Sequence, residues 1–448
     1  MALDTARETA LKILYDIGEK GAYSNISVNK YLEASDLREL DRAFITELVY
    51  GTVKWLIEID YIIAKYSSIK LKKLSPWILN TLRLGVYQVV HTDKIPVSAA
   101  CNTSVDLAKR YGHQASSRYV NAVLRAVAKN KSNLPFPEEK SSENYLSIKY
   151  SHPEWLVKRL VSLFGFNFTK DLLRANNEIA GFSVRVNSLK TTTDRLISLL
   201  LEEGIEAEKG KYLEEALVLH NPSSISRLKA FREGLFQVQD ESSMLCARVL
   251  SPNEGSLVVD VCSAPGGKTT HIAQLMNNKG SIIARDIHQH KLRLIENAAQ
   301  RLGIDIISTQ IFDATQLDNT MIEKADKVLV DAPCSGLGII RRKPDIKYTR
   351  VEDDSNQLKH IQKQILSNAS RYVKLGGELV YSTCTILPEE NLEIVQDFIK
   401  ENPSFEMINI ENLLPTNLRK DTAKHGYIQL FPNVDLTDGF FICKMKRT

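Results

Sequence analysis

From residue 257 onward the sequence alternates between short apolar runs and amphipathic segments, and this alternation restricts the fold more than any other feature of the chain. Strands that alternate with helices along a chain predict a largely parallel, doubly wound sheet. A last apolar run, 440–444, predicts a closing antiparallel edge strand. The predicted strands fall near 257–261, 281–285, 306–311, 327–331 and 378–382, and the predicted helices near 268–276, 289–302, 355–374 and 389–400.

Two of these predicted strands lead directly into a cysteine. The fourth continues as Asp-Ala-Pro-Cys-Ser-Gly through Cys334, and the fifth continues as Ser-Thr-Cys-Thr through Cys384. Most cysteines in proteins are small buried apolar residues. Ligands bind at the carboxyl edge of an open α/β sheet, however, and both cysteines should lie at that edge. Their placement therefore favours a nucleophile and a helper thiol over two structural cysteines.

The first predicted strand ends in a glycine turn, Cys-Ser-Ala-Pro-Gly-Gly-Lys-Thr. The adjacent Gly266 and Gly267 let the backbone pass close to a ligand before a helix begins. A phosphate-binding P-loop would need a glycine where Cys262 stands, which excludes that motif. A dinucleotide-binding turn needs glycines separated by another residue, which excludes it as well.

Asp286 and Asp313 end the second and third predicted strands. An acidic residue at such a position can bind ribose hydroxyls, and it can equally cap the helix that follows. Together with the glycine turn, the two carboxylates indicate an adenosine-bearing ligand. The missing phosphate-binding signals favour S-adenosylmethionine over a nucleotide.

Residues 1 to about 130 have apolar residues at helical spacing throughout, which predicts an all-helical domain with short loops. Residues 51–130 contain 12 Lys or Arg against 4 Asp or Glu, whereas residues 1–50 contain 6 against 9. The basic half is a candidate RNA surface, although a solvated helical face would have a similar charge.

The middle of the chain begins with a polar, Lys/Ser/Glu/Pro-rich linker over 130–144. After a helical stretch, predicted strands at 183–187 and 216–219 enclose a helix and indicate a small α/β unit. Arg185 and Asn187 should share one face of the first strand and are candidate RNA contacts, with ordinary solvated strand polarity as the alternative. We expect three domains, with ranges 1–135, 136–235 and 236–448.

The 448-residue chain starts without a basic-then-apolar signal pattern, and none of its apolar runs approaches the ~18 residues of a membrane helix. We therefore expect a cytoplasmic monomer with reduced thiols. The six cysteines form no Cys-x-x-Cys pair and no cluster with histidine, which argues against a metal site. The net charge of +4 is too small to identify a partner.

The glycine turn and the two cysteine motifs, the second followed by Pro-Glu-Glu-Asn, resemble those of the RNA 5-methylcytosine methyltransferases. Segments 41–44, 95–100 and 121–125 resemble a NusB-type RNA-binding domain, which makes the chain similar to the RsmB type of that family. Members of this type methylate one cytosine of 16S ribosomal RNA. Ser263 stands where alanine is more common, and Thr385 where serine is more common, but neither difference removes a reactive group.

The resemblance implies an all-α NusB-like domain, a small α/β domain and a Rossmann-like class I methyltransferase domain that converts S-adenosylmethionine to S-adenosylhomocysteine. Cys384 would add to carbon 6 of cytosine, because carbon 5 is a poor nucleophile until that addition occurs. Cys334 would then assist removal of the carbon 5 proton, Asp331 would contact the cytosine edge, and Lys268 would lie between cofactor and active site. The expected cofactor residues are Cys262, Ser263, Ala264, Pro265, Gly266, Gly267, Lys268, Asp286, Asp313 and Asp331.

The basic run Arg341-Arg342-Lys343, with Lys347 and Arg350 beyond it, follows the Cys334 loop and is predicted to contact RNA phosphates. The expected partner is 16S ribosomal RNA, unassembled or in an early small subunit. Two alternatives stay open: a 5-methylcytosine methyltransferase that acts on transfer RNA, and a non-catalytic ribosome-assembly factor. DNA cytosine methyltransferases use the Pro-Cys cysteine as the nucleophile, so the presence of both thiols indicates the RNA type.

Overall fold

The computed structural model describes residues 4–34, 37–139, 142–220, 222, 224–352 and 354–448, the side chain of Ser355 excepted. Residues 1–3 of the predicted N-terminal helix and residues 140–141 of the predicted linker lie outside this description. The chain divides into two compact units. The helical unit comprises Met1–Glu178 and Ile340–Arg350, and the α/β unit comprises Ile179–Ile339 and Val351–Thr448.

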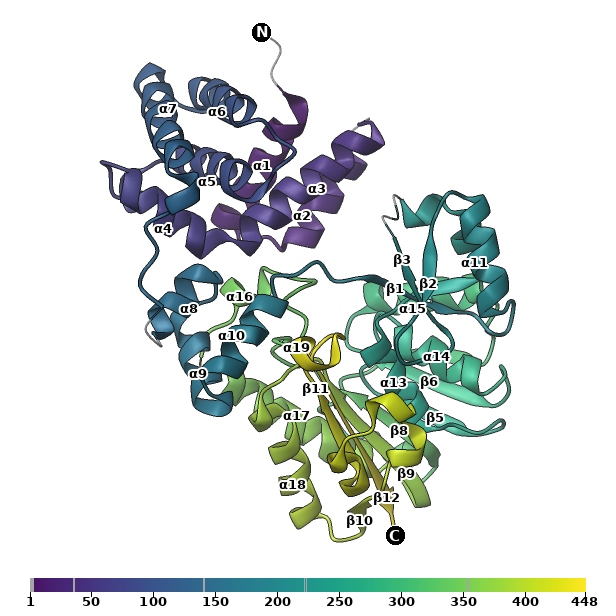
Figure 1. The fold of residues 1–448 in the computed structure, drawn as a ribbon. Coiled ribbons are helices and arrows are strands. Elements are labelled where there is room, and N and C mark those ends of the chain that lie inside the picture. Colours follow the sequence, from purple (N-terminus) through teal and green to yellow (C-terminus); the bar gives the residue numbers. More distant parts are fainter. Residues whose placement is uncertain (1–3, 35–36, 140–141, 221, 223, 353) are drawn as a thin grey trace. The chain divides into compact units, whose positions relative to one another are not determined.

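The helical unit confirms the predicted all-helical front of the chain, and Figure 1 shows α1 to α7 grouped together. Local sequence sets the helix starts: Ser75 accepts a hydrogen bond from the amide of Ile78, and Pro76 occupies the first turn of α5. The bounds are α1 (Thr5–Lys20), α2 (Ser24–Glu33), α3 (Glu39–Lys54), α4 (Leu56–Tyr66), η1 (Leu71–Lys73), α5 (Pro76–His91), α6 (Val97–Tyr111), α7 (Gln114–Lys129), η2 (Lys131–Asn133), α8 (Glu143–Lys149), α9 (Glu154–Phe164), α10 (Phe166–Ala175) and α16 (Ile346–Thr349).

The first part of the α/β unit is a four-stranded antiparallel sheet in the order β2-β3-β1-β4. Along the chain its elements run βαββαβ, the arrangement of ferredoxin-like folds. It confirms the predicted small α/β domain, although α8 to α10 of the range 136–235 belong to the helical unit. The bounds are β1 (Phe182–Val186), α11 (Thr193–Glu202), β2 (Ala207–Lys209), β3 (Ala216–Leu219), η3 (Ile225–Arg227), α12 (Lys229–Arg232) and β4 (Phe236–Val238).

The second part of the α/β unit is the predicted doubly wound sheet, in the order β10-β12-β9-β8-β5-β6-β7 with β11 beside β12. Strands β7, β6, β5, β8 and β9 are parallel neighbours, as predicted. The bounds are α13 (Glu241–Leu250), β5 (Leu257–Asp260), α14 (Gly267–Leu275), β6 (Ser281–Asp286), α15 (Gln289–Leu302), β7 (Ile307–Ile311), η4 (Asn319–Met321), β8 (Ala325–Asp331), α17 (Asp354–Ser370), β9 (Val373–Thr383), η5 (Pro388–Glu390), α18 (Leu392–Glu401), β10 (Phe405–Met407), η6 (Glu411–Leu413), η7 (Thr416–Leu418), η8 (Asp421–His425), β11 (Tyr427–Leu430), α19 (Pro432–Asp435) and β12 (Phe440–Arg447).

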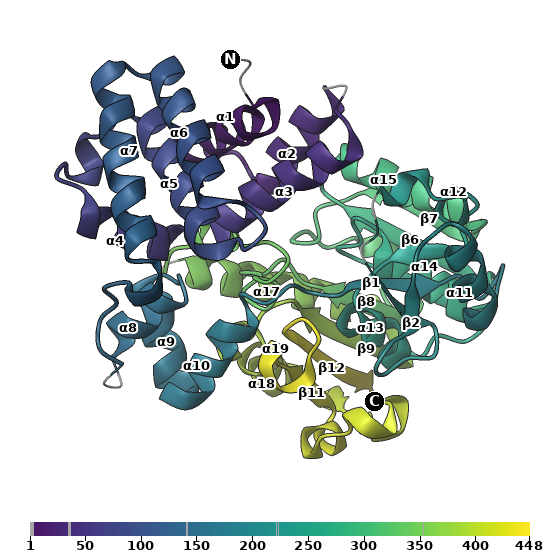
Figure 2. The ribbon, with the colours of Figure 1, turned by 45° about the horizontal axis from the view of Figure 1, so that its top comes forward.

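The two faces of this sheet are covered by different helices. Alternate strand residues pack against α13, α14 and α15 on one face, and their neighbours pack against α17 and α18 on the other. Figure 2 shows these helices around the central strands. A parallel sheet that is buried on both faces presents its strand ends as the accessible edge, which places the loops after the strands where a ligand can reach them.

The predicted closing strand, β12, is antiparallel to β9 as expected, but the prediction that it forms the sheet edge is wrong. The short strands β10 and β11 both pair with its other side. They come from the irregular segment between α18 and β12, whose brief apolar stretches gave no strand signal. Within the described residues, none of the helices is long and apolar enough to cross a membrane.

Candidate active site

The two cysteine loops meet because their strands are in register. Strands β8 and β9 are parallel neighbours in which Asp331 lies opposite Ser382. Cys334 and Cys384 follow a few residues later, and their Sγ atoms are 3.1 Å apart. This distance fits two contacting thiols, because the sulfurs of a disulfide lie about 2.05 Å apart. The structure therefore brings the two predicted reactive cysteines together at the carboxyl edge of the sheet.

The surroundings of the Cys334 thiol favour its protonated form. Its contact with Cys384 and its burial both raise its pKa well above the ordinary range. A second charge on neighbouring sulfurs would be strongly unfavourable, so the pair carries at most one thiolate. The loops that hold the thiols are closely packed: a Cβ on Gly338 would lie 2.8 Å from the carbonyl oxygen of Cys384. The amide of Gly338 donates to the carbonyl of Cys384, which ties one thiol loop to the other.

A half-buried ion pair lies at the same sheet edge as the thiols. Lys268 Nζ is 2.7 Å from Asp331 Oδ2, and Ser382 donates a hydrogen bond of 2.9 Å to Asp331 Oδ1. Burial alone would lower the pKa of Lys268, but the negative charge of Asp331 raises it well above its ordinary value, and the charge of Cys384 raises it further. The ammonium also lies over the ring of Phe440, 5.0 Å from its centroid. Lys268 is therefore a permanent cation between the glycine turn and the thiol pair.

The glycine turn lies between β5 and α14 at the same sheet edge. Gly266 has φ +98°, a left-handed conformation that side chains rarely adopt, and a Cβ there would lie 3.1 Å from Ile295. The amide and hydroxyl of Ser263 both donate to the carbonyl of Arg285 at 2.9 Å. The structure thus places the whole predicted segment, residues 262–268, as one fixed turn that leads into a helix N-terminus.

Asp286 and Asp313 lie at the ends of the next two strands, as predicted. Asp286 Oδ1 accepts a hydrogen bond from the amide of His288, and Asp313 Oδ1 accepts from the amide and hydroxyl of Thr315. Both carboxylates therefore cap the backbone that follows them, in line with the capping alternative. In the described part of the chain these bonds engage only Oδ1, which leaves Oδ2 of each residue available to a ligand.

Asp260, the last residue of β5, is a further acidic group at this edge that the sequence analysis did not single out. It is buried, and its Oδ2 accepts a hydrogen bond of 2.7 Å from Thr269. Burial raises its pKa to about 7, and the nearby Asp331 contributes to the rise. Within the described residues, its Oδ1 has no hydrogen-bond partner. A buried polar atom without a partner next to a glycine turn indicates a place for a ligand donor.

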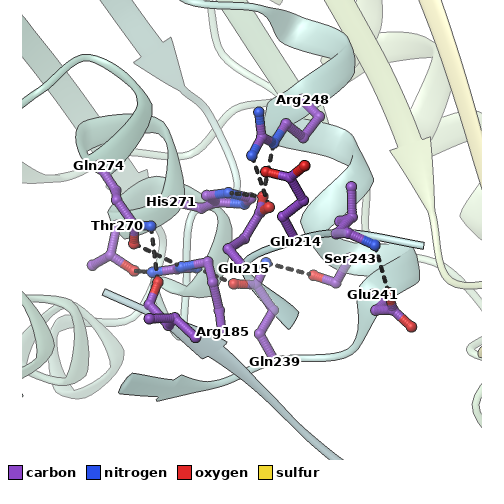
Figure 3. Close-up of polar contacts among 12 residues, drawn as sticks. Arg185, Glu214, Glu215, Gln239, Glu241, Ser243, Arg248, Thr270, His271 and Gln274 are labelled. Carbon is purple, nitrogen blue, oxygen red and sulfur yellow. Dashed lines mark hydrogen bonds and ion pairs between the residues drawn. The ribbon is translucent and has the colours of Figure 1, made fainter. Parts of the chain in front are cut away.

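The structure contradicts the prediction that Arg185 and Asn187 face RNA. Both are buried, with 0% and 1% of their surface exposed. Figure 3 shows the Arg185 guanidinium directed at α14, where it donates to the carbonyl of Gly267 and the hydroxyl of Thr270. The Asn187 amide donates to the carbonyls of Gly234 and Leu302. These polar side chains are thus packed against α14 and the end of α15 and do not face solvent.

The basic run after the Cys334 loop divides into two parts. Lys343 is exposed and Arg341 and Arg342 are half-buried, so their predicted RNA contacts stay predictions. The suggestion that Lys347 grips phosphates is wrong, because Lys347 is fully buried in the helical unit. Its ammonium donates to the carbonyls of Lys54 and Ser151, both at 2.8 Å. Burial lowers its pKa well below the ordinary value.

The sequence analysis assigned no role to several side chains that hold the site together. Ser382 fixes Asp331, and Phe440 lies under Lys268. Thr385 belongs to the Ser-Thr-Cys-Thr motif and Glu390 to the Pro-Glu-Glu-Asn motif. The motifs alone do not predict the hydrogen bonds that these two side chains make. Among the described residues, no three His, Cys, Asp or Glu side chains gather as metal ligands would.

The strand order and the antiparallel last long strand are those of class I methyltransferases. The paired thiols and the Lys–Asp pair lie at the carboxyl edge of this sheet, where open α/β sheets bind ligands. Three family models match the chain: the NusB family over residues 4–129, the RsmF/B-like ferredoxin-like domain over 152–226, and the 16S rRNA methyltransferase RsmB/F over 247–446.

A protein from Bacillus subtilis named probable ribosomal RNA small subunit methyltransferase B is 41% identical, with 100% of each chain covered. The ribosomal RNA small subunit methyltransferase B of Pectobacterium atrosepticum is 30% identical, with 98% of each chain covered. The chain belongs to the RsmB/F family of 16S ribosomal RNA methyltransferases.

Two solved structures have a similar fold. The crystal structure of PH0851 matches 100% of both chains with a TM-score of 0.83 and 28% identity. NSun6 from Pyrococcus horikoshii, solved with SFG, matches 66% of this chain and 98% of its own with a TM-score of 0.59 and 27% identity.

Proposed function

We propose that this protein transfers a methyl group from S-adenosylmethionine to carbon 5 of one cytosine in 16S ribosomal RNA, through a covalent bond between Cys384 and carbon 6. The observation that carries the proposal is the 3.1 Å contact between the Cys334 and Cys384 sulfurs beside the Lys268–Asp331 pair. Methylation of a base nitrogen or a ribose hydroxyl would give neither thiol a role.

The turn between β5 and α14 suits S-adenosylmethionine. The left-handed Gly266 keeps side chains away from the turn, and the Oδ1 atom of Asp260 is buried without a partner in the described chain. Asp286 and Asp313 end the two neighbouring strands, where carboxylates can accept hydrogen bonds from an adenosine moiety. SFG, present in the NSun6 structure, is an analogue of this cofactor. When bound, the cofactor supplies the electrophilic methyl group.

Cys384 is the proposed nucleophile. Its thiolate sulfur forms a bond to carbon 6, and the electron pair of the carbon 5–carbon 6 double bond makes carbon 5 nucleophilic. The Lys268 ammonium supports this thiolate, because the charge of Cys384 is one of the causes that raise the Lys268 pKa. After methylation, loss of the carbon 5 proton re-forms the double bond and expels Cys384.

The roles of the two thiols are taken from the resemblance of their motifs, and the raised pKa of Cys334 is compatible with them. The Cys384 sulfur is the largest single cause of that rise. Once Cys384 is bonded to carbon 6, its sulfur carries no charge. It then no longer raises the pKa of Cys334. Cys334 therefore becomes easier to deprotonate after the adduct has formed, when a base is needed for the carbon 5 proton.

Asp331 is proposed to hold the cytosine edge. Its carboxylate can accept a hydrogen bond from the cytosine amino group, the usual pairing of an acidic side chain with this base. Lys268 and Ser382 orient the carboxylate for that contact. The target base must leave its stack to reach the thiols, which costs roughly a few kcal/mol and favours a cytosine in an unpaired RNA segment.

Bisulfite sequencing of small-subunit ribosomal RNA tests the proposal. RNA from cells that lack the gene is compared before and after incubation with the purified protein and S-adenosylmethionine. One cytosine that becomes resistant to conversion supports both the reaction and the target. If no cytosine becomes resistant, either in naked RNA or in subunits, the proposal fails, and transfer RNA becomes the next substrate to examine.

A further inference from the structure

Glu390, in the Pro-Glu-Glu-Asn motif after the second thiol, is a buried carboxylate with 0% of its surface exposed. Its Oε2 atom accepts hydrogen bonds from the amide of Ser335 at 2.8 Å and from the side-chain amide of Gln362 at 3.0 Å. Its Oε1 atom accepts from the hydroxyl of Thr385 at 3.4 Å. A buried carboxylate needs such donors, because each one offsets part of the cost of removing the charge from water.

These contacts reach both thiol loops. Ser335 directly follows Cys334, and Thr385 directly follows Cys384. The hydroxyls of Ser335 and Thr385 are also 2.8 Å from one another. The carboxylate, the amide and hydroxyl of Ser335, and the hydroxyl of Thr385 thus form a closed set of hydrogen bonds, in residues that directly follow each cysteine.

The backbone of Glu390 and its partner Gln362 are also held by hydrogen bonds. Its carbonyl accepts a hydrogen bond of 2.8 Å from the hydroxyl of Tyr381, which is buried in β9. Gln362, from α17, also donates to the carbonyl of Pro333 at 2.9 Å, just before the first thiol. The carboxylate is therefore held in place, and it cannot readily shift with either of the loops that hold Cys334 and Cys384.

We propose that Glu390 is the positioning residue that sets the spacing of the Cys334 and Cys384 thiols. The inference rests on the proposed function only for the importance of that spacing. In that function Cys384 must reach carbon 6 while Cys334 reaches the proton on the adjacent carbon 5 of the same cytosine. Small displacements of reacting groups cost rate steeply: a shift of about 1 Å can cost roughly 100-fold.

Glu390→Gln tests the inference. Glutamine keeps the shape of the side chain but removes its charge and one of its two acceptor oxygens. Dibromobimane, which becomes fluorescent when it bridges two close thiols, reports the spacing without RNA or cofactor. A Cys334→Ser protein provides the blank for other reactive cysteines.

We expect Glu390→Gln to slow bridging and to lower kcat by about tenfold or more, with KM for RNA and cofactor nearly unchanged. Thr385→Val removes one hydroxyl that bonds to Glu390 and should slow bridging and lower kcat to a smaller extent. This variant replaces Glu390→Gln as the test if Glu390→Gln does not fold. Glu393→Gln is the matched control, because that carboxylate is half-exposed and pairs with Lys359 at the protein surface. It should behave as the wild type.

Two outcomes overturn the inference. Folded Glu390→Gln and Thr385→Val proteins that bridge the thiols at the wild-type rate would show that Glu390 stabilises the fold and does not set the spacing. Bridging that slows while kcat stays unchanged would show that the spacing does not matter for the reaction. If the wild-type protein has no methyltransferase activity on RNA, the proposed function fails, and the bridging rates still test the position of the thiols.

Discussion

Lys268 Nζ lies 2.7 Å from Asp331 Oδ2, and this pair joins the two halves of the site. Lys268 is in the first turn of α14, directly after the glycine turn, whereas Asp331 ends the strand that leads to Cys334. The groups proposed to hold the cofactor and the groups proposed to hold the cytosine are therefore linked through one ion pair.

Replacing Lys268 with methionine should abolish methylation and destabilise the protein. The variant leaves the half-buried Asp331 carboxylate without its cation, which costs roughly 1–3 kcal/mol of unfolding free energy. Urea unfolding and methyl transfer from labelled cofactor measure the two effects.

The double variant Lys268→Met with Asp331→Asn separates stability from catalysis. It removes both charges, so it should recover most of the lost unfolding free energy but none of the activity. Recovery of methylation in the double variant would contradict a role for the Lys268 cation in supporting the Cys384 thiolate.

Asp260 should make stability depend on pH in a defined window. Its folded pKa of about 7 lies above the unfolded value of about 4, so the folded state binds the additional proton between these values. The stability that protonation contributes is complete below about pH 4 and is lost as pH rises to about 7. We expect the unfolding free energy of the wild type, relative to Asp260→Asn, to fall by about 1.4 kcal/mol per pH unit across that window. Equal pH profiles of the two proteins would show that Asp260 titrates normally.

Arg185→Gln should weaken binding of S-adenosylmethionine and leave RNA binding unchanged. Arg185 donates to Gly267 and Thr270 in the first turn of α14, so its loss should loosen the cofactor turn. Calorimetry should show an affinity about tenfold lower. Arg195→Gln, at an exposed position of the same domain, is the control. A selective loss of RNA affinity in Arg185→Gln would instead restore the RNA-facing interpretation.

Lys343 and Lys347 should differ in the salt dependence of RNA binding. Lys343 is exposed, and if it contacts a phosphate, Lys343→Gln should reduce the slope of log K against log salt by about 1. Lys347→Met should leave that slope unchanged, because its ammonium is buried among the carbonyls of the helical unit. A reduced slope for Lys347→Met in a folded protein would show that this segment rearranges to reach RNA.

The sequence predicted the fold classes and the main strands well, because apolar runs and strand ends are local signals. The contact between the thiols depends on these strand ends. Adjacent parallel strands bring the loops that follow them to one sheet edge, and β8 and β9 are such neighbours, so Cys334 and Cys384 lie together. The domain ranges and the RNA contacts of Arg341, Arg342 and Lys343 stay predictions.

The errors at Arg185 and Lys347 came from contacts distant in sequence. Arg185 alternates with apolar residues as a solvated strand face would, but that face is covered by α14, 85 residues further along the chain at Thr270. Lys347 has the sequence pattern of an exposed basic run. Its ammonium instead donates hydrogen bonds to the carbonyls of Lys54 and Ser151, which are 293 and 196 residues away in the sequence. Nothing in a local pattern predicts which surface a segment will pack against.

The most direct test of the proposed mechanism is the covalent protein–RNA adduct. Cys334→Ala, Cys384→Ala and wild-type proteins are incubated with substrate RNA and S-adenosylmethionine and separated on a denaturing gel. The mechanism predicts that Cys334→Ala accumulates a protein–RNA adduct, because Cys384 still adds to carbon 6 while release fails. An adduct that forms with Cys384→Ala and not with Cys334→Ala would reverse the roles of the two thiols and contradict the proposed mechanism.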